Sequence, residues 1–332
     1  MVKKPVELEV VILAAGRGRR LEPVRLTHSK AMTPILGVPI IERLIQTFHS
    51  IGLKRFVVVR APHDMQMENA VCSLNGYDNL EIRTCIQHEP KGPADALKCA
   101  KKLVSSDFIL TSCDNLYPEI HFSRLIKEWQ EHKPSAILTL SNIRPGDLNK
   151  AAGVKLRGKE VLDFKEKPGE NSGDWDAISK FIFVLDCSLM DFIDRVPESK
   201  RGELEAQEAI RLMIDKLKPG RKPMGIFVQR YLHLTSAEDL LKITEHYLAE
   251  HRPYGVHPGA KVHEGAQIEE PVMIEKDAVV CEGAKIGPNV YIGAGARVGK
   301  KVKLSRCIVY PGAHIEECEC RQSQVIICKS KG

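Results

Sequence analysis

The sequence predicts an α/β protein: a Rossmann-like, mostly parallel mixed sheet flanked by helices, followed by a short left-handed parallel β-helix. Over residues 1 to about 230, apolar strand-like segments alternate with amphipathic helix-like segments, and the connections between them are short. This alternation is typical of a parallel sheet that is covered by helices on both faces. After residue 255 the aliphatic residues instead recur at every sixth position, which is typical of a parallel β-helix.

The segments of the first part follow one another in the order that a parallel sheet requires. Strands are predicted at residues 8–14, 55–60, 81–87, 107–114, 135–140, 178–185 and 224–229, and helices at residues 40–52, 93–104, 203–217 and 235–251. Gly52 ends the first helix, Pro93 begins the second, and Ser236 caps the last one with Asp239 three residues on. A linker rich in Pro and Gly begins at residue 252, so the predicted domains are residues 1–250 and 251–332.

The six-residue repeat occupies most of the second domain. A small or β-branched residue follows each repeated aliphatic residue after four positions, so both sets can stack on their copies in the next coil. The repeated aliphatic residues are Val256, Val262, Ile268, Ile274, Val280, Ile286, Ile292, Val298 and Leu304. Because the end and the open face of a solenoid are ready-made interfaces, we expect a homo-oligomer formed through the β-helix.

The composition favours a globular protein with a small anionic ligand. The chain has 332 residues and a formal charge of +6, too modest for a nucleic-acid partner, and its aromatic content of 5% is low for base stacking. No apolar stretch approaches the roughly 20 residues of a membrane span, and the N-terminal apolar run continues into a glycine turn as a strand rather than a signal peptide. We therefore expect no membrane partner and a cytoplasmic location. The ten cysteines lie mostly inside apolar runs, as reduced core thiols do.

The stretch VILAAGRGRRLEPVRLTHSKAMTPI, residues 11–35, passes from an apolar strand into glycines and then into basic residues. It lacks the third glycine of the dinucleotide-binding G-x-G-x-x-G motif, and the second strand ends in Arg60 instead of an acidic residue. It does not match the P-loop motif G-x-x-x-x-G-K-[ST] either. The stretch therefore predicts a compact turn whose amides converge on phosphate oxygens, followed by cations that suit a triphosphate. A tight turn with a solvated basic face is the alternative.

The same stretch resembles the signature of the sugar-1-phosphate nucleotidylyltransferases, which runs roughly L-A-A-G-x-G-x-R-L-x-P-x-T-x-x-x-P-K-x-x-x-P-x-x-x-x-P-I. Further motifs of that family follow in the same order, namely IQHEPKGPADAL, TSCDN, AAGV and DFKEKP. With the repeats, the resemblance covers nearly the whole chain. The positions that match the first signature are Gly16, Gly18, Arg20, Leu21, Pro23, Lys30, Pro34 and Pro39.

The resemblance implies that the chain joins a nucleoside triphosphate to a sugar 1-phosphate and releases pyrophosphate. The phosphate of the sugar is already an anionic nucleophile, so the protein must align two anions and offset their repulsion instead of supplying a base. By analogy, Arg20 holds the β- and γ-phosphates, Lys30 neutralises charge at the reacting phosphate, and Lys167 holds the phosphate of the sugar. Gly153 and Glu166 line the sugar pocket.

The resemblance also implies how the nucleotide and a metal are held. Gln87 and the backbone at Gly92 read the Watson–Crick edge of a pyrimidine, so UTP or dTTP is the expected donor and glucose 1-phosphate the expected acceptor. Asp114, at the carboxyl end of a central strand, binds Mg²⁺. The backbone that cradles the nucleotide comprises Leu13, Ala14, Ala15, Gly16 and Gly18. Each polar residue also has a structural alternative: a strand-end cap for Asp114, a loop contact for Gln87, and an exposed turn for Glu166 and Lys167.

Four positions depart from the family pattern. Ser29 replaces a proline before the lysine, Cys113 replaces a glycine before the aspartate, and Lys180 stands where a glycine commonly lies near the sugar. His233 occupies the place of a second metal ligand, which is usually an acidic residue or asparagine. Because Mg²⁺ prefers oxygen ligands, His233 is interpreted either as part of a changed metal site or as a buried histidine that ends the strand.

These departures leave two other functions open. The chain could be a non-catalytic, regulatory homologue that binds a nucleotide-sugar, an alternative that Cys113, Lys180 and His233 favour. The β-helix could also be an acyltransferase, as in bifunctional relatives, in which case the chain would transfer an acetyl group from coenzyme A. His257, His263 and His314 are instead interpreted as surface residues, and the ordinary role of the coils is subunit association.

Overall fold

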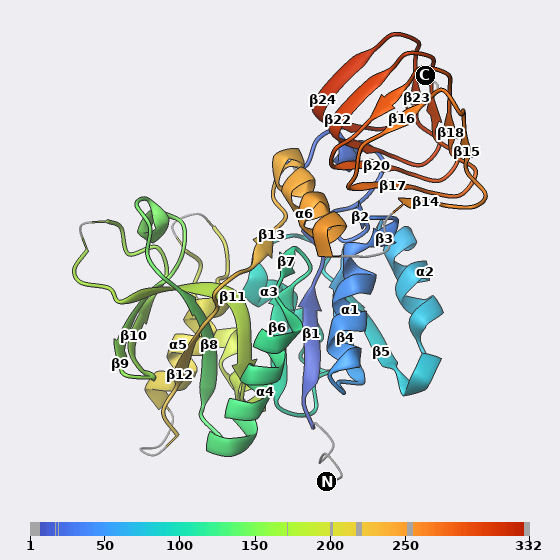
Figure 1. Cartoon of the computed structure of the whole chain (residues 1–332). Coiled ribbons are helices and arrows are strands. Elements are labelled where there is room, and N and C mark those ends of the chain that lie inside the picture. Colours follow the sequence, from blue (N-terminus) through green and yellow to red (C-terminus); the bar gives the residue numbers. More distant parts are fainter. Residues whose placement is uncertain are drawn as a thin grey trace. The chain divides into compact units, whose positions relative to one another are not determined.

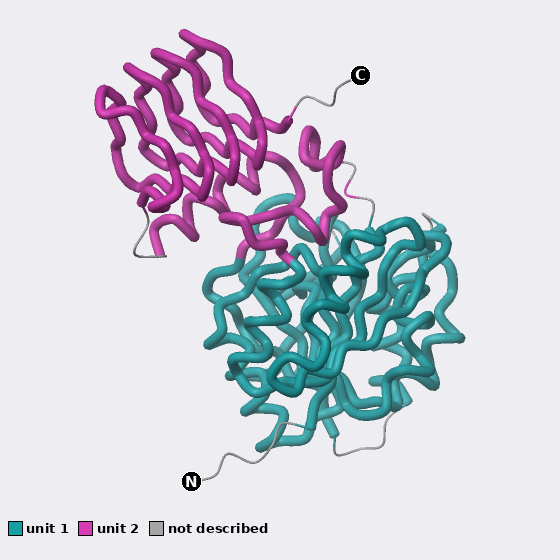
Figure 2. The backbone as a smooth tube through the Cα atoms, turned by 90° about the vertical axis from the view of Figure 1, so that its right-hand side faces the viewer, with its two compact units in different colours: residues 1–16, 41–231 teal, residues 17–40, 232–332 magenta. Residues whose placement is uncertain are grey.

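The computed structural model describes residues 7–16, 18, 20–170, 172–199, 202–216, 221–250 and 255–328. It divides into two compact units, residues 1–16 with 41–231 and residues 17–40 with 232–332, which Figure 2 colours separately. The chain therefore contributes residues 17–40 to the second unit before it returns to the first. The two units are defined by the contacts between their residues. They do not test the domain boundary after residue 250, which stays a prediction from the sequence.

The first unit is built on a nine-stranded mixed sheet (Figure 1) with the order β5-β4-β1-β6-β11-β8-β12-β10-β9. β1 pairs in parallel with β4 and β6, whereas β11 is antiparallel to β6 and β8. The predicted mostly parallel mixed sheet is therefore confirmed. The strands are β1 (Glu9–Leu13), β4 (Arg55–Arg60), β5 (Glu81–Ile86), β6 (Phe108–Ser112), β8 (Ala136–Ser141), β9 (Gly153–Arg157), β10 (Glu160–Lys165), β11 (Ala177–Leu185) and β12 (Met224–Phe227).

Helices lie on both faces of this sheet (Figure 1), because its central strands are apolar on both sides. On one face, Val11 and Leu110 share a buried cluster with residues of α3 and α5. On the other face, Phe48 of α1 contacts Phe56 of β4 and Phe122 of α4, at ring-centroid distances of 6.5 and 4.3 Å. The helices of this unit are α1 (Ile40–Ser50), α2 (Met65–Leu74), α3 (Pro93–Ala100), α4 (Glu119–His132) and α5 (Ala206–Lys216).

The second unit contains the parallel β-helix that the repeat predicts. Val256 pairs in parallel with Ile274, and Ile274 with Ile292, so one coil takes three six-residue repeats. The repeated aliphatic and small residues from Val272 to Ile315 form one buried cluster inside the coils. The coil strands are β14 (Gly255–Val256), β15 (Lys261–Val262), β16 (Gln267–Ile268), β17 (Val272–Ile274), β18 (Val279–Val280), β19 (Lys285–Ile286), β20 (Val290–Ile292), β21 (Arg297–Val298), β22 (Lys303–Val309), β23 (His314–Ile315) and β24 (Cys320–Ile326).

Helix α6 (Ala237–Glu250) lies beside these coils in the same unit. As predicted, Ser236 caps it: the Asp239 amide donates to Ser236 Oγ at 3.2 Å, and the Ser236 amide donates to Asp239 Oδ2 at 2.9 Å. Arg306 of β22 ties the helix to the coils, because its guanidinium donates to Glu245 at 2.6 Å and to both carboxylate oxygens of Glu238.

Short segments complete the two units. They are β2 (Pro34–Ile35), β3 (Val38–Pro39), β7 (Asn115–Leu116), β13 (Leu232–His233), and the 3₁₀ helices η1 (Val24–Leu26), η2 (Tyr77–Asn79), η3 (Asp147–Asn149), η4 (Cys187–Asp191) and η5 (Ile193–Arg195). In the second unit, β2 and β3 pair as a hairpin whose turn residues, Leu36 and Gly37, have φ of 47° and 77°. The same segment packs against α6.

The cysteine prediction needs a correction. No disulfide joins the ten cysteines, but only Cys113 and Cys307 are buried, while Cys72 and Cys187 are exposed. Cys72 lies on the solvent side of α2, and Cys187 begins a surface 3₁₀ turn, so an apolar run did not guarantee burial there.

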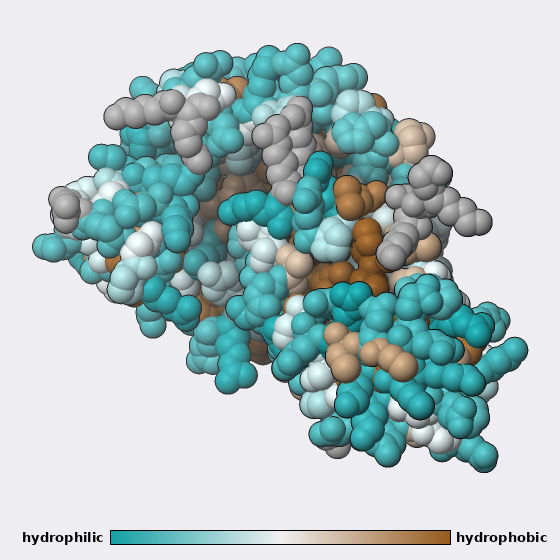
Figure 3. All heavy atoms as spheres, turned by 90° about the horizontal axis from the view of Figure 1, so that it is seen from above, coloured by the Kyte–Doolittle hydropathy of each residue, from teal (hydrophilic) through white to brown (hydrophobic). Residues whose placement is uncertain are grey.

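Within the described ranges, no helix combines the length and the apolar character that crossing a bilayer requires. On the face that Figure 3 shows, the surface is largely hydrophilic, and hydrophobic side chains gather only in small patches.

Candidate active site

The carboxyl ends of four neighbouring parallel strands bring several predicted residues to one edge of the sheet. The Ala14 amide donates to Val59 at 2.8 Å, the Cys113 amide to Leu13 at 3.1 Å, and the Gln87 amide to the Arg60 carbonyl at 2.9 Å. The turn after β1, Gln87 after β5, and the residues after β6 therefore share this edge. Open α/β sheets bind their ligands at such an edge.

The turn after β1 is lined by small residues. Ala14 and Ala15 are 3% and 8% exposed, whereas Gly16 is exposed. A Cβ added at Gly16 would meet no atom within 4 Å. The backbone at Gly16 therefore borders open space, into which a ligand can approach its amide closely.

In the second unit, the glycine and the lysine of the first signature lie together. Gly18 has φ of 57°, and a Cβ added there would lie 3.2 Å from the Cβ of Lys30, so the lysine stem crosses the glycine backbone. The Leu21 amide donates to the Gly18 carbonyl at 2.9 Å and closes a turn that leaves Arg20 exposed. Arg19 lies outside the described residues. The structure thus brings Gly18 and Lys30 together, with Arg20 on the adjacent turn.

Asp114 is oriented by its neighbours at the end of β6. Ser112 Oγ donates to its Oδ1 at 2.5 Å, Asn115 Nδ2 donates to the same oxygen at 3.3 Å, and Asn115 also bonds Ser112. Hydrogen bonds of this kind fix the direction of a metal-binding carboxylate. A single half-buried carboxylate fits Mg²⁺, which keeps several waters and is completed by substrate phosphates.

Gln87 closes the loop that leads into α3. Its Nε2 donates to the Gly92 carbonyl at 3.2 Å and to Asp95 Oδ2 at 2.7 Å. Gly92 has φ of 111°, and a Cβ there would come within 2.6 Å of the Leu204 carbonyl oxygen. The loop contact considered for Gln87 is therefore present. Because both donors of its amide point into the loop, Oε1 is the atom with which Gln87 can face a base.

A tryptophan that the sequence patterns do not single out covers Gly153. A Cβ added at Gly153 would lie 2.6 Å from Trp175 and 3.0 Å from Pro168, so the indole and the proline ring sit on the glycine. Lys167 follows Glu166 with φ of 44°, and its Nζ lies 3.3 Å from Glu166 Oε1. Gly153 pairs with Lys165 at the end of β10, so Glu166 and Lys167, which follow directly, lie at the same end of these two strands. A bulky residue shortly after a Pro-Gly turn is too common to have been a signal.

Lys180 lies beside an aromatic stack near Asp114. Its Nζ is 4.8 Å from the centroid of the Tyr231 ring, which stacks on Tyr117 at 5.7 Å with an interplanar angle of 23°. Burial raises the pKa of Tyr117 well above its usual value, and the neighbouring Tyr231 and Asp114 side chains add to this effect. This cation–π contact with Tyr231 stabilises the ammonium of Lys180, at a position where the family commonly has a glycine.

The structure contradicts one of the two interpretations of His233. It is exposed in β13 of the second unit, with its Nδ1 3.4 Å from Thr235 Oγ1. The expectation of a buried histidine that ends the strand is therefore wrong, because β13 is only two residues long and this side chain faces solvent.

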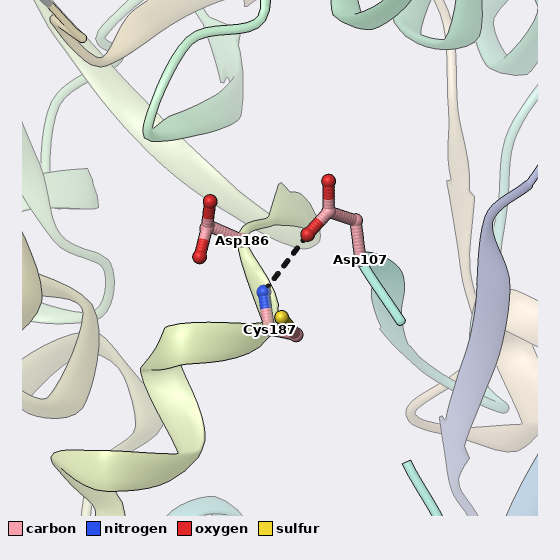
Figure 4. Close-up of side chains that lie close together, drawn as sticks. All are labelled: Asp107, Asp186 and Cys187. Carbon is pink, nitrogen blue, oxygen red and sulfur yellow. Dashed lines mark hydrogen bonds between the residues drawn. The ribbon is translucent and has the colours of Figure 1, made fainter. Parts of the chain in front are cut away.

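A second group of metal-ligating side chains, Asp107, Asp186 and Cys187, lies at the other end of the sheet strands (Figure 4). Asp107 accepts from the Cys187 amide at 3.1 Å, and Asp186 accepts from the Ser188 amide at 2.9 Å. Asp186 is also paired with the guanidinium of Arg221. These bonds cap η4, and the arginine already supplies the positive charge, so the group is structural.

Comparisons with known proteins identify the family to which the chain is similar. Residues 9–227 match the family described as nucleotidyl transferase, and residues 268–331 match the GMPPB C-terminal domain. A bifunctional protein GlmU from Methanococcus maripaludis is 26% identical over 244 residues, covering 73% of this chain and 54% of that protein. A glucose-1-phosphate thymidylyltransferase from Neisseria gonorrhoeae is 23% identical over 207 residues, covering 62% of this chain and 70% of that protein.

Solved structures share the fold. A UDP-glucose pyrophosphorylase complexed with UDP-glucose superposes with a TM-score of 0.64 at 16% identity, covering 74% of this chain and 99% of that one. This likeness establishes the nucleotide-diphospho-sugar transferase fold for the first unit. The chain spans about half the length of several curated relatives that it matches.

Proposed function

The chain belongs to the nucleotidyl transferase family, and we propose that it transfers a nucleotidyl group from a nucleoside triphosphate to a sugar 1-phosphate and releases pyrophosphate. The observation that carries this proposal is the carboxyl edge of the parallel strands, where Asp114, held by Ser112 and Asn115, shares one edge with the open turn at Gly16. An oriented carboxylate and an exposed turn of amides suit a metal-bound polyphosphate.

The proposed reaction is an in-line displacement. An oxygen of the sugar phosphate forms a bond to the α-phosphorus, the bond from that phosphorus to the bridging oxygen breaks, and pyrophosphate leaves with the electron pair. The nucleophile is already anionic, so no proton has to be removed. Lys30 and Arg20 stabilise the charge that develops on the pyrophosphate, and Lys167 holds the phosphate of the sugar.

We assign the metal site to Asp114 and Mg²⁺. Members of the family generally use a divalent metal, and a carboxylate with oxygen-rich phosphates is the environment that Mg²⁺ prefers. When bound, the ion neutralises phosphate charge and holds the triphosphate in line. We do not assign His233 as a ligand, because Mg²⁺ prefers oxygen ligands to the nitrogen of an imidazole.

The proposed donor is UTP or dTTP, and the proposed acceptor is glucose 1-phosphate. Gln87 presents Oε1, which can accept the N3–H of uracil or thymine, because its Nε2 already donates to Gly92 and Asp95. Cytosine has no hydrogen on N3, so it would face this oxygen with a lone pair.

The test is pyrophosphate release from the full chain with Mg²⁺, over a panel of four nucleoside triphosphates plus dTTP and several sugar 1-phosphates. We expect turnover with UTP or dTTP and a hexose 1-phosphate. A folded protein that binds a nucleotide-sugar but is silent across the whole panel would instead be a regulatory homologue, and the proposal would be wrong. We do not propose acetyl transfer, because His257 and His263 accept amide hydrogen bonds from Gly259 and Gly265 inside their turns.

We also propose a cytoplasmic homo-oligomer that associates through the β-helix. In the first coil, Val256 and Ile268 are 44% and 36% exposed, whereas the same repeat position is buried in later coils. The exposed aliphatic side chains of this first coil can pack against the same surface of a second chain. Light scattering, which measures the molar mass of the protein in solution, tests the homo-oligomer. A monomeric mass at micromolar concentration would contradict it.

A further inference from the structure

Residues 20–40, here called the arm, carry Arg20 and Lys30 but pack on the β-helix. The arm belongs to the same compact unit as residues 232–332. Its hairpin, β2–β3, packs against α6, and α6 packs against β22 and β24 of the coils. The proposed triphosphate-binding residues therefore sit on a segment that is supported by the repeats.

The first specific contact joins His28 to Tyr310. Their ring centroids lie 5.6 Å apart in an edge-to-face arrangement, with an interplanar angle of 61°. Tyr310 is 3% exposed, and its hydroxyl has no hydrogen-bond partner among the described parts of the chain. Tyr310 therefore contacts the arm through its ring. The residue that it contacts, His28, is only two positions from Lys30.

The second specific contact lies at the tip of the hairpin. A Cβ added at Gly37 would lie 3.1 Å from the hydroxyl oxygen of Tyr291 and 3.4 Å from Glu275 Oε1. Gly37 has φ of 77°, so both the backbone conformation and this close approach require glycine. Tyr291 belongs to β20, and Glu275 follows β17, so the tip rests on two successive coils.

The arm is stiff between these contacts. Leu21, Val24, Ala31 and Ile35 are at most 1% exposed. Within the arm, the His28 amide donates to the Val24 carbonyl at 3.0 Å, and the Met32 amide donates to the Ser29 carbonyl at 3.1 Å. A displacement of His28 is therefore transmitted to Lys30 instead of being absorbed by a loose loop.

We propose that Tyr310 is a positioning residue for the nucleoside triphosphate: through His28 it fixes the arm, and thereby Lys30 and Arg20. This inference rests on the proposed function. It adds that the second unit controls the affinity for the nucleotide. The β-helix then acts on the nucleotide substrate and leaves the contacts of the sugar phosphate, which lie around Lys167 in the first unit, unchanged.

The experiment compares Tyr310→Leu, Tyr310→Phe and Val298→Ala in the full chain. We expect Tyr310→Leu to lower kcat/KM for the triphosphate about 10-fold, because a misplacement of about 1 Å can cost even more, while KM for the sugar phosphate stays at the wild-type value. Tyr310→Phe should keep wild-type kinetics, since it retains the ring. Val298 is a fully buried residue of the coils, so Val298→Ala lowers Tm without touching the arm and should leave both KM values unchanged.

Two further measurements make the outcomes distinct. Tyr310→Leu should speed amide hydrogen exchange in residues 20–33, and His28→Leu combined with Tyr310→Leu should be no worse than either alone. An active wild type whose kcat/KM for the triphosphate is unchanged in Tyr310→Leu overturns this inference and leaves the proposed function standing. A wild type without turnover on any substrate pair overturns the proposed function, and this inference with it.

Discussion

At the scale of single residues, Asp114 owes its orientation to two donors on one oxygen. Asparagine at this position would keep the size of the side chain and an oxygen that accepts from Ser112, but it would carry no charge for a cation. We expect Asp114→Asn to lower nucleotidyl transfer by about 100-fold or more, because even indirect metal partners contribute 10- to 100-fold. The measurement is initial-rate pyrophosphate release, with Tm as the check on folding.

The matched control is Asp174→Asn, which removes the same charge from an exposed position of the same unit. Its rate should equal that of the wild type. An equal loss in both variants would mean that net charge, rather than a metal contact, explains the effect.

Two glycines near the proposed site should respond oppositely to the same substitution. Gly153→Ala should destabilise the fold by about 1–3 kcal/mol, because the new methyl group collides with Trp175. Gly16→Ala should leave stability nearly unchanged, because its Cβ would meet open space. Urea unfolding measures both, and tryptophan fluorescence should shift only in Gly153→Ala. An unshifted spectrum with full stability would show that Trp175 does not cover Gly153.

At the scale of elements, a buried histidine joins α4 to β8. His121 is 5% exposed, and its Nε2 lies 2.9 Å from Thr139 Oγ1. Burial lowers the pKa of His121 to about 4, and the charge of Arg124 adds to this effect. Since the unfolded chain binds this proton more readily than the folded one, stability should fall as the pH drops from about 6.5 to about 4, by up to about 3 kcal/mol.

His121→Gln should flatten this pH dependence, because glutamine does not titrate there. Urea unfolding at pH 7 and pH 4.5 measures the difference. His132→Gln on the exposed end of the same helix is the control and should keep the wild-type slope. If the slopes of all three proteins coincide, His121 does not carry the acid sensitivity.

Arg306 joins the coils of the β-helix to helix α6. Its side chain is 23% exposed, and its guanidinium bonds two glutamates of the helix at once. We expect Arg306→Met to destabilise the second unit by about 1–2 kcal/mol, more than an isolated surface pair would. Arg321→Met, which breaks a pair with Glu319 at the more exposed end of the coils, should cost less. Thermal unfolding compares them, and similar Tm values would contradict the prediction.

At the scale of the whole molecule, the two units share the proposed active-site residues unequally. Gly16, Gln87, Asp114, Gly153, Glu166 and Lys167 belong to the first unit, and Gly18, Arg20 and Lys30 to the second. The first signature motif is therefore split between the two units within a few residues. This division is the basis of the proposal that Tyr310, a residue of the repeats, affects nucleotide binding through the arm.

The sequence alone determined the features that depend on local periodicity. The six-residue repeat predicts the coils because each aliphatic residue stacks on its own copy, and the alternation of apolar segments predicts the sheet with its helices. Helices α2 and α4 were not predicted, and neither were β9 and β10. Residues 65–74 show a weaker amphipathic pattern than the predicted helices, and the short strands have few apolar positions. Residues 119–132 are as amphipathic as the predicted helices α3 and α6, so the pattern of α4 was present in the sequence and was missed.

Only the tertiary structure decided which distant residues meet. Trp175 on Gly153, Tyr231 beneath Lys180 and Tyr310 against His28 join residues between 22 and about 280 positions apart. No period or spacing encodes such pairs, because they arise when the whole chain excludes water from its cores. The same holds for the arm: its hairpin packs against α6, and His28 lies against Tyr310 of the coils, and no local pattern around residue 30 could reveal these contacts.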